Sequence, residues 1–279
     1  MLTVLEVFNR TESFFGSKGI PNPKFEAQLV MAHALSIDRL QIFMRFDQPM
    51  EQAELDAVRE LVRRRGEGVP YAYLVGNQEF WSLEFEVGPG VLIPRPDTET
   101  LVEHVLAALP EDEELFLADI CAGSGCIGIA IASERPQVKV YAVELSEQAL
   151  PYLKTNIAKH GLEKRVAALR GDLLGPIPAN RPIDWVLSNP PYIATAEMHG
   201  LAVSKTEPLE ALDGGQDGLD IYRRLVPAAA ERARVGVAME IGHDQGQAVS
   251  KLFEAAGLTQ VQVLQDLGKR DRVVMGRKG

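Results

Sequence analysis

The 279-residue sequence has only two cysteines, Cys121 and Cys126, and both flank one glycine-rich loop. Two cysteines are too few for a zinc site built from cysteines alone, and a disulfide between them would have to fit a tight turn. No apolar run approaches the roughly 18 residues that a membrane-spanning helix needs. Residues 1–6 also lack the basic stretch and apolar core that begin a secretory signal. We therefore expect a cytoplasmic protein with reduced cysteines and no membrane segment.

Positive charge is scarce as well. The 29 Lys and Arg residues are outnumbered by 39 Asp and Glu residues, and the net charge is −10. Affinity for a phosphate backbone rests on clustered Lys and Arg, so this balance argues against a large nucleic-acid footprint. The one dense basic run, Arg63-Arg64-Arg65, falls at the end of a predicted helix, where cations offset the helix dipole. A contact with an acidic or RNA-bearing partner is the alternative for that run.

Histidines are few, and their spacing does not predict a metal site. The five are His33, His104, His160, His199 and His243. We expect His33 to pack at the apolar side of a helix and the others to serve surface or packing roles. No metal ligand is predicted anywhere in the chain.

Apolar residues are plentiful, at 46% of the chain, and their pattern divides the sequence into three parts. Residues 1–74 repeat apolar positions at helical spacing and predict a small helical domain. Residues 78–93 alternate and turn at Gly88-Pro89-Gly90, which predicts a β-hairpin linker over residues 75–95. Residues 96–279 alternate strands and helices, which indicates an α/β fold with a parallel sheet. We expect strands at 115–120, 138–143, 166–170, 183–188, 235–240, 259–265 and 271–276, the last two forming an antiparallel hairpin.

A glycine-rich loop, Cys121-Ala122-Gly123-Ser124-Gly125, follows the first of these strands and leads into an apolar helix. Glycines at a strand-to-helix turn let the backbone approach a ligand and present the free N–H groups of the helix start. The next strand ends in Glu144, where a carboxylate can accept both hydroxyls of a ribose. Because Gly123, Gly125 and Gly128 satisfy G-x-G-x-x-G, the loop alone fits a nicotinamide enzyme as well as a methyltransferase.

A second motif, Asn189-Pro190-Pro191-Tyr192, ends the predicted strand 183–188. The prolines cannot continue a central strand and lock the chain into an extended turn. We expect the Asn189 amide to project from the strand end beside a Pro190 carbonyl that no local N–H occupies. Two such acceptors can grip one NH2 group while the Tyr192 ring covers its flat face. Alone, this tetrapeptide is often only a strand-ending turn, but the glycine-rich loop upstream favours a site for methylating a planar amino group.

These residues resemble the S-adenosylmethionine-dependent amino-methyltransferases of the Rossmann-like class. The resemblance rests on Asp119-x-x-x-Gly123-x-Gly125, Glu144, Asp172 and Asn189-Pro190-Pro191-Tyr192. It narrows to the release-factor glutamine methyltransferases, the HemK/PrmC family, through residues 78–81, 92–99 (Leu-Ile-Pro-Arg-Pro-Asp-Thr-Glu), 207–212, 214–219 and 240–242. The chain departs from the family where Cys121-Ala122 replaces a frequent Gly-Thr and where Leu173 replaces a frequent aromatic.

The resemblance implies a Rossmann-like methyltransferase domain with a seven-stranded sheet, preceded by a helical substrate-recognition domain and a β-hairpin. It implies the cofactor S-adenosyl-L-methionine, with binding residues Cys121, Ala122, Gly123, Ser124, Gly125, Glu144, Asp172, Leu173 and Asn189. It implies catalytic roles for Asn189, Pro190, Pro191 and Tyr192.

The implied reaction is N5-methylation of the glutamine in the Gly-Gly-Gln motif of peptide chain release factors, by a monomer that binds no nucleic acid directly. Two other classes of function stay open. One is amino-methylation of another target, such as a ribosomal-protein glutamine or an adenine base. The other is a nicotinamide oxidoreductase or a non-catalytic binding module, for which no hydride-transfer residues are evident.

Overall fold

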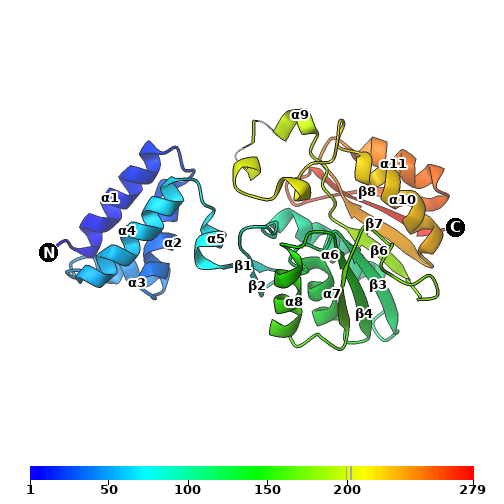
Figure 1. The fold of residues 1–279 in the computed structure, drawn as a ribbon, viewed down its shortest axis with the longest axis horizontal. Helices are drawn as coiled ribbons and strands as arrows, with labels where there is room; N and C mark the ends of the chain where they lie inside the picture. The colour runs from blue at the N-terminus through cyan, green and yellow to red at the C-terminus, as the bar shows by residue number, and fades with distance from the viewer. Residues whose placement is uncertain (199, 202) are drawn as a thin grey trace. The chain divides into compact units, whose positions relative to one another are not determined.

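The computed structural model describes residues 1–198, 200–201 and 203–279, so His199 lies outside the described residues. The chain separates into two compact units, Met1–Gly76 and Asn77–Gly279 (Figure 1). No helix in the described ranges combines the length and the apolar composition that crossing a bilayer requires.

The first unit is helical and has a core of its own. Its helices are α1 (Val4–Ser17), α2 (Pro23–Ala34), α3 (Arg39–Met44), α4 (Gln52–Gly66) and α5 (Tyr71–Val75). Thr3 and Glu6 form a capping box that satisfies free N–H groups at the start of α1. Phe8, Phe15 and Met31 are among the buried side chains that hold these helices together. The helical nature of this region is confirmed.

Two details of the first unit bear on the sequence predictions. His33 is exposed, so its predicted packing role is wrong: it lies in the last turn of α2, next to the buried residues but not among them. Within the basic run, Arg63 pairs with Glu60 and Glu67, and Arg65 pairs with Glu26. Neighbouring carboxylates therefore neutralise much of this run inside the unit.

The second unit begins with a hairpin and continues as an α/β sheet. Its strands are β1 (Asn77–Phe80), β2 (Leu83–Glu86), β3 (Leu115–Ile120), β4 (Val138–Glu144), β5 (Val166–Arg170), β6 (Trp185–Ser188), β7 (Gly236–Glu240), β8 (Leu258–Gln265) and β9 (Asp271–Lys278). Its helices are η1 (Pro96–Thr98), α6 (Glu99–Ala108), α7 (Cys126–Glu134), α8 (Leu150–Lys159), α9 (Thr195–Met198), η2 (Val203–Lys205), η3 (Leu209–Ala211), α10 (Asp220–Arg232) and α11 (Gly246–Ala255).

Strands β3 to β9 form one seven-stranded sheet in the order β5-β4-β3-β6-β7-β9-β8. The first five of these neighbours are parallel, and β9 pairs antiparallel with both β7 and β8. The α/β class, the seven strands and the final antiparallel hairpin are confirmed. The chain moves outward from β3 to β5 and then returns to β6 on the other side of β3. This reversal between β3 and β6 is the switch point where such sheets bind ligands.

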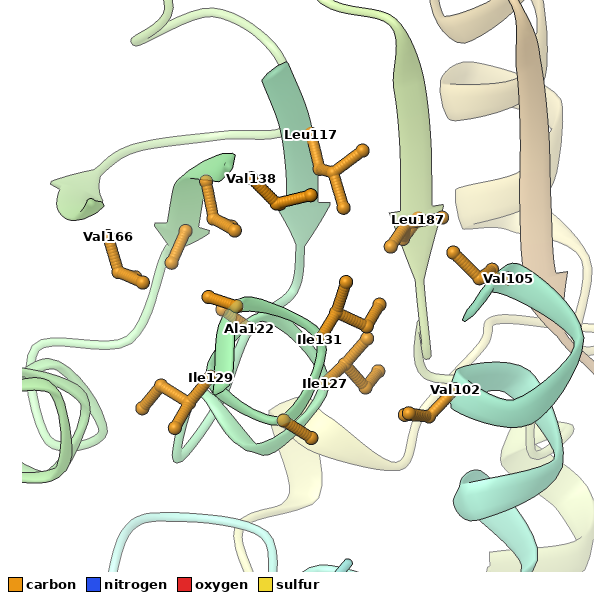
Figure 2. Close-up of a cluster of buried hydrophobic side chains, with 14 of the residues drawn as sticks. Val102, Val105, Leu117, Ala122, Ile127, Ile129, Ile131, Val138, Val166 and Leu187 are labelled. Carbon is orange, nitrogen blue, oxygen red and sulfur yellow. The ribbon is translucent and has the colours of Figure 1, made fainter. Parts of the chain in front are cut away.

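Successive residues of the central strands face opposite layers, which creates two cores. Leu117 and Leu187 pack in the layer of α6, α7 and α8, whereas Ala118 and Val186 face α10 and α11. Figure 2 shows the first layer, where the isoleucines of α7 lie among side chains of β3, β6 and α6. Because α7 is apolar on nearly every side, it is buried against the sheet, and the loop that precedes it is fixed at the strand ends.

The hairpin forms as predicted, but its predicted turn is wrong. The strands β1 and β2 are joined by Trp81 and Ser82, both with positive φ (53° and 56°), as a two-residue turn requires. Glu99 accepts the Trp81 backbone N–H and Glu134 accepts its indole N–H, which stabilise this uncommon conformation. Gly88 and Gly90 lie after the hairpin, where a Cβ would collide with Tyr152 and Gln148. The segment does turn, because the Val91 N–H donates to the Gly88 carbonyl at 3.3 Å and Gly90 has φ +98°, but this turn follows β2 and does not join the hairpin strands.

Candidate active site

A pocket lies at the carboxyl ends of the parallel strands, beside the switch point of the sheet. Each of the strands β3, β4, β5 and β6 delivers predicted site residues there, directly after or at its last residue. Nine of the predicted residues line the pocket: Cys121, Ala122, Gly123, Ser124, Glu144, Asp172, Leu173, Asn189 and Pro191. Gly125, Pro190 and Tyr192 do not line it. The sheet thus gathers residues that lie as far as 70 positions apart in the sequence (Cys121 and Pro191).

The glycine-rich loop reaches the pocket through Gly123. This residue has φ +56°, and a Cβ built on it would meet no heavy atom within 4 Å, so its open side faces space. Gly125 behaves differently, because its Cβ would lie 2.5 Å from Leu153 and 3.0 Å from Ile129 in the core. Gly125 therefore shapes the turn and lets α7 pack, while Gly123 provides the surface that a ligand can approach.

The loop is anchored from below by Asp119, which is fully buried at the end of β3. Its Oδ2 accepts the Gly128 N–H at 2.9 Å, near the start of α7. Burial raises the pKa of Asp119 to about 7, and the nearby Glu144 charge adds to the rise, while the Gly128 bond opposes it. The other oxygen, Oδ1, is buried and has no hydrogen-bond partner among the described residues.

Glu144 is presented to the pocket by two backbone bonds. Its carboxylate accepts the Gly123 N–H and the Ser146 N–H, each at 2.7 Å. Burial raises its pKa, and these backbone bonds hold the rise back. Ser146 donates its hydroxyl to Glu210 at 2.7 Å, and Glu210 also lines the pocket. Carboxylates therefore dominate this side of the pocket, which favours hydroxyl donors and positive charge in a ligand.

Asp172 and Leu173 form the rim after β5. The Asp172 carboxylate forms an ion pair with Arg224 of α10, and both side chains are about half exposed. Leu173 adopts a positive φ of 49° and packs against the hydrophobic cluster beneath it. This pair offers a ligand one polar edge and one aliphatic surface.

Asn189 is held by a residue that the sequence analysis did not place among the site residues. Its Nδ2 donates to the Thr98 hydroxyl at 3.2 Å, and Thr98 also lines the pocket. Among the described residues, no hydrogen-bond donor reaches the Pro190 carbonyl. The Tyr192 hydroxyl donates to Glu240 at 3.4 Å, and burial together with the Glu240 charge raises the pKa of Tyr192. Asn189 Oδ1 is thereby left as the acceptor end of its amide.

A further wall of the pocket joins two distant segments. Glu207 is buried and accepts the Ile93 N–H at 3.0 Å, and it forms an ion pair with Arg95 at 2.5 Å. These contacts fasten the segment that carries Glu210 onto the segment before η1. Thr98, Arg95, Glu207 and Glu240 all occur in the segments that carry the family resemblance, and that was the one indication of their importance in the sequence.

The fold and the pocket define a Rossmann-like methyltransferase. Residues 96–206 match the family model "Methyltransferase small domain", and residues 6–76 match "PrmC N-terminal domain". Solved structures support the fold alone: a methyltransferase from Pyrococcus furiosus is 18% identical with a TM-score of 0.55 and covers 77% of this chain and 98% of its own. The N-terminal domain of human METTL16 in complex with SAH is 17% identical with a TM-score of 0.53 over 71% of this chain and 76% of its own.

Curated relatives identify the particular family. The release factor glutamine methyltransferase of Geobacter sulfurreducens is 40% identical over 99% of this chain and 97% of that protein. The protein of the same name from Moorella thermoacetica is 41% identical over 97% of each. The chain therefore belongs to the release factor glutamine methyltransferase family, and the predicted family and enzyme class are confirmed.

Proposed function

We propose that this enzyme transfers a methyl group from S-adenosylmethionine to the side-chain nitrogen of the glutamine in the Gly-Gly-Gln motif of a peptide chain release factor. The observation that carries the proposal is the pair of acceptors at the end of β6. Thr98 binds the Nδ2 end of Asn189, which leaves Oδ1 available beside the Pro190 carbonyl. The names of the relatives support the substrate, because they are release factor glutamine methyltransferases.

The residues of the pocket fit S-adenosylmethionine. Open space above Gly123 admits a ligand against the backbone, and Glu144 provides carboxylate oxygens at the end of β4. Each oxygen of a carboxylate has two lone pairs, so Glu144 can accept ribose hydroxyls while keeping its two backbone bonds. Asp172 and Leu173 would hold the adenine by its polar edge and its face. The bound cofactor supplies a strongly electrophilic methyl group carried on a sulfonium.

The protein must compensate for a weak nucleophile. The nitrogen lone pair of an amide is delocalised into its carbonyl, so the enzyme has to position and polarise the group. Asn189 Oδ1 and the Pro190 carbonyl each accept one N–H of the substrate amide, which shifts electron density onto the nitrogen and fixes its orientation. Pro191 lines the pocket beside them. Tyr192 is anchored on Glu240 and lies next to Pro191 in the chain, and we assign its ring the role of shielding the bound substrate amide from water. The proton lost by the methylated amide passes to water.

The partner and the molecular setting form part of the same proposal. We infer that the enzyme acts as a monomer in the cytoplasm, with the helical domain at 1–74 and the hairpin region at 75–95 contacting the release factor. The net charge of −10 supports a protein substrate over a nucleic acid.

Mass spectrometry of a purified release factor after incubation with the enzyme and S-adenosylmethionine tests the proposal. We expect a single added methyl group on the glutamine of the Gly-Gly-Gln loop. A release factor with that glutamine changed to alanine is the matched control and should gain no methyl group. Preferred methylation of a ribosomal protein, DNA or RNA by the same preparation would contradict the substrate assignment while leaving the amino-methyltransferase chemistry in place.

A further inference from the structure

The side-chain amide of Asn189 has two ends of nearly equal shape, and only one of them can polarise a substrate N–H. Oδ1 must face the reacting amide, because an Nδ2 group in that place would repel the N–H of the substrate. The proposed chemistry therefore requires something in the protein to prevent a rotation of this amide by 180°. Neither Pro190 nor Pro191 has an N–H or a polar side chain that could select one orientation.

We infer that Thr98 is the positioning residue that sets the orientation of Asn189, and that Glu240 sets the direction of the Thr98 hydroxyl. This inference rests on the proposed function of Asn189 as the acceptor for the substrate amide. The geometric basis is the 3.2 Å bond from Asn189 Nδ2 to the Thr98 oxygen.

The position of Thr98 in the sequence supports a role outside its own helix. Thr98 is the N-cap of α6, where a threonine hydroxyl ordinarily accepts a backbone N–H of the first turn. Here it makes no such capping bond and is directed to Asn189 instead, although it is only 2% exposed. The usual local reason for a threonine at this position is therefore absent, and its hydroxyl serves the strand end 91 residues away.

A hydroxyl alone would not choose between the two amide orientations, because it can donate as well as accept. The choice follows from Glu240, the last residue of β7, which is 1% exposed and whose pKa is lowered by a hydrogen bond from the Thr98 side chain. An ionised carboxylate only accepts, so it attracts the Thr98 proton and leaves the oxygen lone pair for Asn189 Nδ2.

The Glu240 carboxylate also binds Tyr192, the last residue of the Asn189-Pro190-Pro191-Tyr192 motif. Tyr192 donates its hydroxyl to Glu240 Oε1 at 3.4 Å, so one buried acidic group orients both Asn189 and Tyr192. Arg272 of β9 brings a positive charge that favours the ionised form of Glu240. Arg272 is itself held by Asp97 at 3.0 Å and by Asp266 at 3.2 Å. The positioning device thus joins η1, β7 and β9 beneath the end of β6.

The test compares Thr98→Val, which removes the hydroxyl at nearly constant volume, with Thr98→Ser, which keeps it. With a release factor as substrate, we expect Thr98→Val to lower kcat about 10-fold, the factor of one lost hydrogen bond. The KM for S-adenosylmethionine should stay within about 3-fold, and Thr98→Ser should recover most of kcat. Thr100→Val is the matched control, because Thr100 is a buried threonine of α6 that does not line the pocket.

A second measurement needs no methyl acceptor. In nitrogen-15 NMR spectra of the free enzyme, we expect the Asn189 side-chain NH2 to exchange slowly with solvent in the wild type, in Thr98→Ser and in Thr100→Val. In Thr98→Val its resonances should shift and exchange faster. If Thr98→Val does not fold, Glu240→Gln replaces it, because a glutamine can donate to Thr98 and should perturb the same resonances.

The two measurements separate this inference from the proposed function. A wild-type enzyme that leaves release factors unmethylated would refute the proposed substrate, and the NMR comparison would still decide the role of Thr98. Unchanged Asn189 resonances in a folded Thr98→Val or Glu240→Gln protein would overturn the inference. A wild-type kcat for folded Thr98→Val would do the same.

Discussion

At the scale of single residues, Asn189 has the most important proposed role, because its side chain is assigned as the hydrogen-bond acceptor for the substrate amide. Asn189 is half-buried at the end of β6 and lines the pocket, and the Nδ2 end of its amide is bound to Thr98. A side chain placed this way contributes chiefly when the substrate amide reacts. Loss of its oxygen should therefore affect the chemical step more than the binding of the cofactor.

Asn189→Ala tests this assignment. We expect kcat to fall about 100-fold or more, comparable with the loss of one preorganised polar group in other active sites. The dissociation constant for S-adenosylmethionine should change only a few-fold in calorimetry. Asn180→Ala, an exposed site outside the pocket, is the matched control and should leave both quantities unchanged. Near-normal kcat in Asn189→Ala would show that the acceptor is held by other groups.

Substitution of Glu144, in contrast to Asn189→Ala, should affect the binding of S-adenosylmethionine. A carboxylate that accepts two ribose hydroxyls forms charge-assisted bonds worth roughly 1.5–3 kcal/mol each. We therefore expect Glu144→Ala to weaken the binding of S-adenosylmethionine at least about 10-fold. Calorimetry on the free enzyme measures this directly, with Glu147→Ala as the control, because Glu147 pairs with Arg170 and does not line the pocket. Unchanged affinity would mean that Glu144 does not hold the ribose.

The sequence predicted which residues lie at this site better than it predicted their hydrogen-bond partners. Strand ends converge in any parallel sheet, so Glu144, Asp172 and Asn189 could be placed together from their positions alone. The hydrogen bonds from Asn189 to Thr98 and from Tyr192 to Glu240 join segments far apart in the chain, and no local pattern reveals them. Gly123 and Gly125 look alike in a motif, yet one faces the pocket and the other faces Leu153. Only the packing of α7 and α8 distinguishes them.

At the scale of elements, the two turns of the second unit show the limits of local sequence signals. Gly88-Pro89-Gly90 is a strong turn signal, but the hairpin turns at Trp81 and Ser82. The long-range acceptors Glu99 and Glu134 outweigh the intrinsic preference of these two residues. The strands of the main sheet were predicted to within a few residues, because buried parallel strands form nearly continuous apolar runs.

The glycine-rich loop provides a prediction at this scale. In Gly123 and Gly161 alike, φ is positive (+56° and +66°) and a Cβ would meet nothing within 4 Å. Alanine at either site should therefore cost a similar conformational strain of about 1 kcal/mol. Only Gly123 lines the pocket, so only Gly123→Ala should weaken the binding of S-adenosylmethionine.

Thermal unfolding and calorimetry on the two variants check this comparison. The melting temperatures should fall by similar amounts, and the dissociation constants should differ. Equal affinity in both variants would show that the cofactor does not approach the backbone at Gly123.

At the scale of the whole molecule, the fold buries two carboxylates whose hydrogen bonds are only partly satisfied. Asp119 of β3 and Glu240 of β7 are both buried, and each has one oxygen with no hydrogen-bond partner among the described residues. Sequence could place both at strand ends, but their burial depends on the helices that cover the two faces of the sheet. Burial raises the pKa of both groups, whereas exposed carboxylates such as Asp217 have a lowered pKa because they pair with arginine, so the two kinds of group change stability in opposite directions with pH.

The sign of this dependence follows from linkage between protonation and folding. Burial raises the pKa of Glu240 to about 7, while the Thr98 hydroxyl and Arg272 oppose the rise and Asp97 adds to it. Tyr192, Tyr222 and Cys126 are the other titratable groups that face this carboxylate. Because the folded state holds the proton more tightly than the unfolded state, the stabilisation is fully present below about 4.5, the ordinary pKa of a glutamate. It is lost as the pH rises through about 7.

We therefore expect the free energy of unfolding to contain a component that declines between about pH 4.5 and 7, and Glu240→Gln should remove the Glu240 share of it. Over the same interval kcat should rise, because only ionised Glu240 directs the Thr98 hydroxyl as the acceptor for Asn189. Urea unfolding and single-turnover methylation at matched pH values measure the two trends, with the exposed Glu254→Gln as control. If stability and kcat both rise with pH in the wild type, and Glu240→Gln shows the same slopes, the titration belongs to another group.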